Sequence, residues 1–85
     1  MKKRNLTIKS KDIEDIITRF YYKGEQLRFQ IIFRLESKEN ILYKDFEDYL
    51  EYRQKFDDLV LLKRREEGIL IKDAIILQKN VTAND

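Results

Sequence analysis

A strict alternation of apolar and polar side chains over residues 26–36 is the feature that most limits how this chain can fold. Five large apolar residues occupy every second position there: Leu27, Phe29, Ile31, Phe33 and Leu35. Most side chains between them are polar, and a period of two sends successive side chains to opposite faces of a strand. The pattern therefore predicts a central strand with one buried face.

The segment before this strand has apolar residues at helical spacing. Four of them follow at i, i+3, i+4 and i+7, which makes one stripe on a helix: Ile13, Ile16, Ile17 and Phe20. Ser10 is a favourable residue at a helix start, and Gly24 suits the position just after a helix end. We therefore predict a helix over residues 11–22, preceded by a short strand over residues 4–9.

The second half of the chain allows two interpretations. Residues 43–56 lack Gly, Pro and β-branched residues and place apolar side chains at helical spacing, which predicts a second helix. This helix either ends near residue 57, leaving a hairpin of strands 59–64 and 69–77, or continues to Glu67 and ends at Gly68. Strand-length apolar runs bounded by turn residues favour the hairpin.

These elements predict an α+β fold with the order β-α-β-α-β-β. We expect a two-layer sandwich in which two helices pack on a mostly antiparallel sheet of three to four strands. Residues 1–78 would form a single domain and residues 79–85 a flexible C-terminal tail. In so small a chain the core is thin, so a homodimer that buries further apolar surface is consistent with the composition.

Several functions are excluded because the chain contains no His, Cys, Pro or Trp. Without Cys there is no disulfide, and without Cys and His there is no zinc site of the common types. Nucleophilic mechanisms that use His as the base are excluded as well. We therefore expect a protein that is not an enzyme and that uses no cofactor.

Two groups of carboxylates are candidates for Mg²⁺ binding. Glu36 and Lys38 end the clearest strand in an arrangement found in metal-dependent nucleases, which also need an acidic residue on a neighbouring strand. Carboxylates also crowd the second predicted helix, namely Asp45, Glu47, Asp48 and Glu51. A solvated strand end and an exposed helix face with i,i+4 ion pairs explain both groups, so we expect no metal site.

The chain shows no apolar segment of the roughly twenty residues that cross a membrane, and no signal peptide. We therefore expect a cytoplasmic protein without membrane contacts. Its richness in Ile and Lys is typical of an AT-rich genome, and with the small size it favours an accessory protein of a phage or mobile element.

The net charge of +2 conceals an uneven distribution along the chain. Residues 1–35 carry a charge of +5, residues 36–58 a charge of −4, and residues 59–85 a charge of +1. Basic residues on the outward strand face and at the predicted hairpin tip are candidates for phosphate contacts: Arg28, Arg34, Lys63, Arg64 and Arg65. The nearly balanced total makes nucleic-acid binding the alternative rather than the leading hypothesis.

The tyrosines of the second predicted helix suggest a different function. One helical face cannot bury all of its aromatic residues, so we expect some tyrosines at the surface, where Tyr is common in protein interfaces. Our leading hypothesis is a small regulatory or interaction protein that docks on a protein partner or on itself. The predicted interface residues are Tyr49, Tyr52, Glu47 and Glu51. No small-molecule substrate is indicated.

Overall fold

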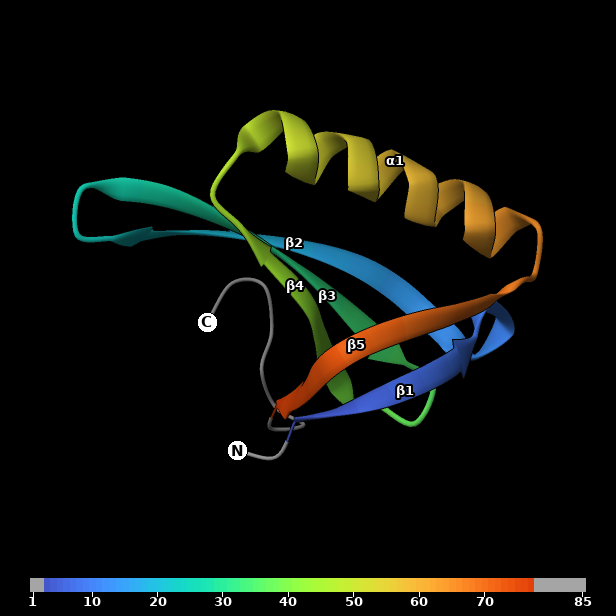
Figure 1. Cartoon of the computed structure of the whole chain (residues 1–85). Coiled ribbons are helices and arrows are strands. Elements are labelled where there is room, and N and C mark those ends of the chain that lie inside the picture. Colours follow the sequence, from blue (N-terminus) through green and yellow to red (C-terminus); the bar gives the residue numbers. More distant parts are fainter. Residues whose placement is uncertain (1–2, 78–85) are drawn as a thin grey trace.

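A computed structural model describes residues 3–77, and the tail expected over residues 79–85 lies outside this range. One α-helix packs on one face of a five-stranded antiparallel sheet (Figure 1). The elements in chain order are β1 (Lys3–Lys9), the 3-10 turn η1 (Ser10–Asp12), β2 (Ile13–Lys23), β3 (Gln26–Leu35), β4 (Asn40–Phe46), α1 (Tyr49–Arg64) and β5 (Gly68–Leu77).

The strands lie in the order β1-β5-β4-β3-β2, so β1 and β2 form the two edges of the sheet. Strands β2, β3 and β4 form a meander, and the first and last described strands, β1 and β5, pair with each other. The two groups are joined where residues 40–42 pair with residues 75–77. Beyond this contact β4 and β5 diverge into a fork (Figure 1).

The core lies between α1 and the sheet. Ile31 and Phe33 of β3 and Ile71 of β5 are completely buried on this covered face, and Leu59 of α1 packs into the same cluster. The alternation of β3 is confirmed at its centre, where Phe29, Ile31 and Phe33 are buried in the core cluster. Leu27 is 38% exposed, and Ile32, on the other face, is buried outside that cluster. The predicted strands over 4–9 and 26–36 are confirmed.

The helix predicted over residues 11–22 is wrong, because this segment is strand β2. The spacing of its isoleucines fits a helix, but the segment is rich in β-branched and aromatic residues that favour a strand. Lys23 pairs with Gln26 around a two-residue turn, in which Gly24 has a φ of +64°. Gly24 therefore begins a hairpin turn rather than following a helix, and Ser10 lies buried in η1 instead of capping a helix.

The second predicted helix is displaced along the chain. Residues 40–46 form β4, and α1 begins after Asp48, whose side chain accepts a hydrogen bond from the backbone N–H of Leu50 at 3.0 Å. The favoured hairpin strand over residues 59–64 is wrong, because α1 continues to Arg64, close to the alternative that extended it to Glu67. Lys63, Arg64 and Arg65 therefore end a helix and do not form a hairpin tip.

The α+β class and the antiparallel pairing are thus confirmed, whereas the two helices and the order β-α-β-α-β-β are not. In the described part of the chain, no helix has the length and apolar character that crossing a bilayer requires.

Candidate protein-interaction surface

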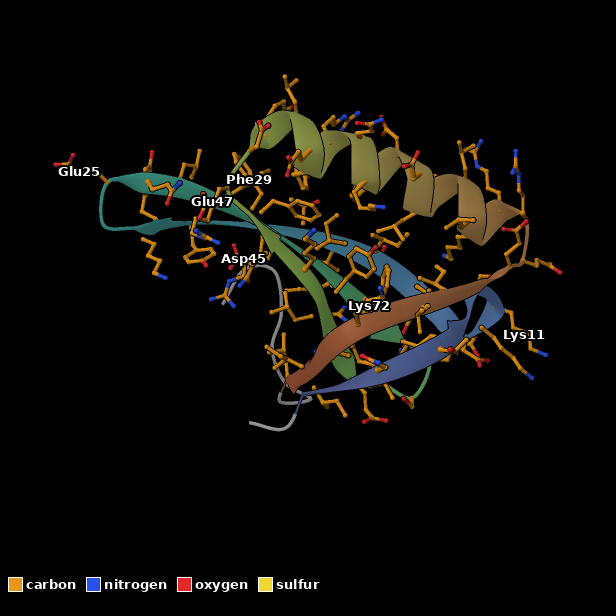
Figure 2. All side chains as sticks on the ribbon, viewed as in Figure 1. Lys11, Glu25, Phe29, Asp45, Glu47 and Lys72 are labelled. Atoms are coloured by element: carbon orange, nitrogen blue, oxygen red, sulfur yellow. The ribbon has the colours of Figure 1, made fainter. Side chains whose placement is uncertain are left out.

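The β2–β3 hairpin extends beyond the rest of the sheet. The pairing of β3 with β4 begins at Phe29 and Phe46, so residues 21–28 form a two-stranded arm without a third strand (Figure 1). Glu25 marks the tip of this arm, and Lys11 lies at the opposite end of the molecule (Figure 2). No strand pairs with the outer side of β3 in this arm, and residues 22–27 are all exposed.

Large apolar side chains are exposed where the arm leaves the sheet. On β2, Phe20 and Tyr22 are 57% and 70% exposed, and Leu27 lies opposite Tyr22 across the hairpin. Tyr49 at the start of α1 is 52% exposed and packs edge-on against Phe29, with ring centroids 5.5 Å apart. We call this set, Phe20, Tyr22, Leu27 and Tyr49, the arm surface.

Tyr52 of α1 packs beneath Phe20 of the arm surface and against Phe29 of β3. Its ring stacks on Phe29 with centroids 5.3 Å apart, and it meets Phe20 edge-on at 6.0 Å. Its hydroxyl is hydrogen-bonded to the hydroxyl of Thr18 at 2.8 Å. With 4% of its surface exposed, Tyr52 belongs to the core, so of the two tyrosines predicted for the interface only Tyr49 is available to a partner.

The two predicted interface glutamates are both exposed near the start of α1. Glu47 lies just before the helix and accepts a hydrogen bond from Arg28 Nη1 at 3.0 Å. Glu51 lies in the first turn of α1, where its carboxylate is favourable for the positive end of the helix. Tyr49, Glu47 and Glu51 are thus all exposed near the start of α1, but they point to different sides: Tyr49 packs against Phe29, Glu47 bonds Arg28, and Glu51 lines a groove with Lys44 and Phe46 of β4.

Sequence reasoning missed Phe20, Tyr22 and Leu27 as surface residues, because it placed the first two on a helix. A signal was present in the sequence. The segment Lys23-Gly24-Glu25-Gln26 lies between two runs rich in aromatic and β-branched residues, which is the pattern of a two-residue hairpin turn. Recognising this turn would have predicted a long hairpin whose end extends beyond the sheet.

On the open face of the sheet, Asp45 is the acceptor of a polar network. Arg28 Nε donates to Asp45 Oδ1 at 2.8 Å, Gln30 Nε2 donates to Oδ2 at 3.2 Å, and the hydroxyl of Tyr21 also donates to Oδ2. Figure 2 shows Asp45 and Glu47 close together below the start of α1. Every member of this network is therefore paired with a neighbour.

The pKa values in this network show what it can do chemically. Partial burial alone would raise the pKa of Asp45, but the hydrogen bonds from Tyr21, Arg28 and Gln30 outweigh burial and hold that pKa below its usual value. The hydrogen bond to Asp45, and next burial, raise the pKa of Tyr21. Both shifts move the groups further from neutral pH, so the network stabilises the strands and is not prepared for proton transfer near neutral pH.

The basic residues predicted to contact nucleic acid do not converge. Arg28 is paired with Asp45 and Glu47, and Arg34 lies at the other end of β3 with its Nε 3.4 Å from Asn40 Oδ1. Lys63, Arg64 and Arg65 lie at the end of α1, where Glu66 and Glu67 follow directly. Lys63 Nζ lies 3.5 Å from the carbonyl oxygen of Glu14. The five residues thus form at least two separate groups, each accompanied by carboxylates.

The carboxylates considered for Mg²⁺ do not converge either. Lys38 pairs with Glu14 at 2.7 Å rather than standing beside Glu36, and Asp48 serves as the helix cap. Asp45 and Glu47 precede α1, so the helical spacing expected for them does not exist. Among the acidic residues whose side chains the structure describes, no group of three or more could hold a metal ion.

The concave regions of the described surface include a cavity and a groove of similar volume. A cavity of about 470 Å³ occupies the fork between β4 and β5, lined mainly by Leu42, Leu70, Lys72 and Ile75. A groove of about the same volume, 470 Å³, runs between β2 and α1, with Ile16, Phe56 and Val60 at its apolar floor and Asp15, Lys63 and Arg64 at its rim. We call the second of these the edge groove, because β2 is an edge strand.

Comparison with protein-family models, curated proteins and solved structures finds no match to this chain. Its function is therefore inferred from its own residues.

Proposed function

We propose that the chain is a small interaction protein without enzymatic activity, which docks on another protein through the arm surface. The observation that supports this most is the exposure of Phe20 and Tyr49, whose rings both contact Phe29 and Tyr52, together with the exposure of Tyr22 two residues beyond Phe20 on β2. An apolar group of this kind, rimmed by polar residues, is typical of a protein-binding site. Tyr in particular supplies a large ring and a polar hydroxyl, which suits the centre of an interface.

The acidic residues at the same end of α1 as Tyr49 indicate the kind of partner. Glu47, Asp48 and Glu51 are all exposed at the start of α1. The pairing of Glu47 with Arg28 leaves part of this acidic character, because the side chain of Glu47 is 66% exposed. A partner with an apolar centre and basic residues at its rim would therefore match the surface, and complementary charge would favour its approach and orientation.

A capture experiment tests the proposal. The tagged wild-type chain is used to isolate binding proteins from a lysate of the source cells, beside a variant carrying Tyr22→Ser and Tyr49→Ser. The matched control carries Leu61→Ser and Leu70→Ser, which are also exposed but lie outside the arm surface. We expect the wild type and the control to retain the same protein and the arm variant to lose it, with the fold of each checked by circular dichroism.

Equal retention by the arm variant, or the absence of any bound protein including a second copy of the chain, would contradict the proposal. Binding of duplex DNA that weakens steeply with salt would also contradict it and would support the nucleic-acid alternative. Because the basic residues are dispersed, we expect no such binding.

A further inference from the structure

Strand β2 presents a long unpaired edge. It contains 11 residues, ends the sheet order, and pairs with β3 on one side only. Alternate residues of an edge strand direct their backbone N–H and C=O groups away from the sheet. Monomeric proteins commonly protect such an edge with Pro, charged residues, a bulge, a short strand or a covering element. Residues 13–23 contain no Pro, the one irregularity in their pairing with β3 lies at the start of the strand between Ile13 and Asp15, and no strand among residues 3–77 pairs with this edge.

The same edge carries a projecting ring and a groove on one face. Thr18 and Phe20 face α1, because Thr18 bonds Tyr52 and the ring of Phe20 packs edge-on against Phe29 and Tyr52. The edge groove begins beside Ile16, four residues before Phe20. A projecting aromatic ring and an apolar groove are therefore separated by one short stretch of strand.

The charges of β2 are divided between its two halves. Glu14 and Asp15 lie near its start, whereas Arg19 and Lys23 lie near its end. Asp15 and Arg19 are both exposed on the open face, where Asp15 lies opposite Arg34 and Arg19 opposite Gln30. An antiparallel pair of two such strands brings the acidic half of each beside the basic half of the other, whereas a parallel pair brings like charges together.

We propose that a second copy of the chain pairs antiparallel along β2 around a two-fold axis at Thr18, so that Phe20 of the arm surface is buried against it. This names the partner in the proposed function and rests on it. With Thr18 opposite Thr18 of the other copy, Ile16 lies opposite the second copy's Phe20. The exposed ring of each copy then enters the edge groove of the other, where Phe56 and Val60 cover it.

The same register also places opposite charges beside each other and lets the backbone groups of the two edges form hydrogen bonds. Asp15 lies opposite Tyr21 of the second copy and diagonal to its Arg19 and Lys23, within reach of long side chains. The backbone ladder runs from Asp15 to Tyr21 on each copy and joins the two sheets into one. Both helices then lie on the same face of a ten-stranded sheet.

Light scattering on the full chain over a range of concentrations tests the dimer, since one copy has a mass of 10.4 kDa. We expect about twice this mass for the wild type. The single substitutions Asp15→Arg and Arg19→Asp place like charges beside each other, so each should weaken association about tenfold. The double variant restores opposite charges and should regain association. Lys72→Glu, on the opposite part of the sheet, is the control and should have no effect.

The position of the axis has its own test. The described chain has no cysteine, so Thr18→Cys introduces a single thiol. Residues directly opposite in an antiparallel pair have Cα atoms about 5.5 Å apart, which a disulfide can bridge. We expect mild oxidation to link the two copies of this variant, and not those of a Lys72→Cys control.

A monomer at every concentration would overturn the inference, as would a dimer that neither charge substitution weakens. A wild-type dimer whose Thr18→Cys variant cannot be cross-linked would overturn the register. If the chain remains monomeric while the arm variant loses a captured protein of another kind, the second copy is the wrong partner and the proposed function stands.

Discussion

The two faces of the sheet differ in what stabilises them. The covered face is apolar and packs against α1, with Phe33 and Ile31 completely buried. The open face carries the charged network around Asp45, whose side chain is still 24% exposed, beside the buried Ile32. Apolar packing is insensitive to pH, whereas ion pairs near the surface are weakened by acid and by salt. The same strand, β3, therefore contributes to stability by two mechanisms that can be separated by experiment.

The largest effect is expected from Phe33→Ala on the covered face. Removing a completely buried ring leaves a cavity in the core and costs about 3–5 kcal/mol, a large part of the stability of a small domain. Denaturant unfolding followed by circular dichroism measures this loss. Leu70→Ala, at an exposed position on β5, is the control and should cost much less. Equal losses for the two variants would contradict the assignment of the core.

A smaller loss is expected from Asp45→Asn on the open face, about 1–2 kcal/mol at neutral pH, because hydrogen bonds from three side chains weaken. The pKa of Asp45 is lowered in the folded protein, so its contribution is present above the pKa of the unfolded chain and is lost as the pH falls through the folded pKa. The wild type should therefore lose stability in acid more steeply than the variant. Parallel pH profiles for both proteins would argue against this role of Asp45.

Removing a single hydrogen bond on the covered face gives a comparison with Asp45→Asn on the open face. Tyr52→Phe removes the hydroxyl that bonds Thr18 but keeps the ring that stacks on Phe29. We expect a loss of about 1 kcal/mol that is the same in acid and at neutral pH, because the hydrogen bond joins two hydroxyls and involves no carboxylate. The unfolding series used for Asp45→Asn also measures this loss. A loss that changes strongly with acid would contradict the difference in pH dependence between the two faces.

The smallest effect is expected from Tyr21→Phe, with a loss of about 0.5–1 kcal/mol at neutral pH. The pKa of Tyr21 is raised in the folded protein, so its contribution is complete below the pKa of the unfolded chain and is lost as the pH rises through the folded pKa. The difference between wild type and variant should therefore shrink in strong alkali. Ultraviolet titration of the phenol checks the direction of the shift, and an unshifted Tyr21 would contradict it.

The sequence predicted structure correctly where its apolar pattern fitted only one kind of element. The alternation of residues 26–36 predicted β3 and the burial of Phe29, Ile31 and Phe33 on one face, whereas the exposure of Leu27 and the burial of Ile32 were not predicted. The segment over residues 13–23 fits both periods, and its pairing with β3 decided the outcome. Tyr49 lies at the start of α1 and is exposed, whereas Tyr52 is buried by contacts with Thr18 and Phe29, which belong to distant parts of the chain.

The narrow contact between β4 and β5 has a consequence for the order of folding. The meander β2–β3–β4 is built from neighbouring segments, whereas pairing β1 with β5 requires closure of a loop of nearly the whole chain. Only residues 40–42 and 75–77 join the two groups of strands within the sheet. We expect the amide hydrogens of β1 and β5 to exchange with solvent sooner than those of β3, so that the molecule opens first at the strands nearest its two ends.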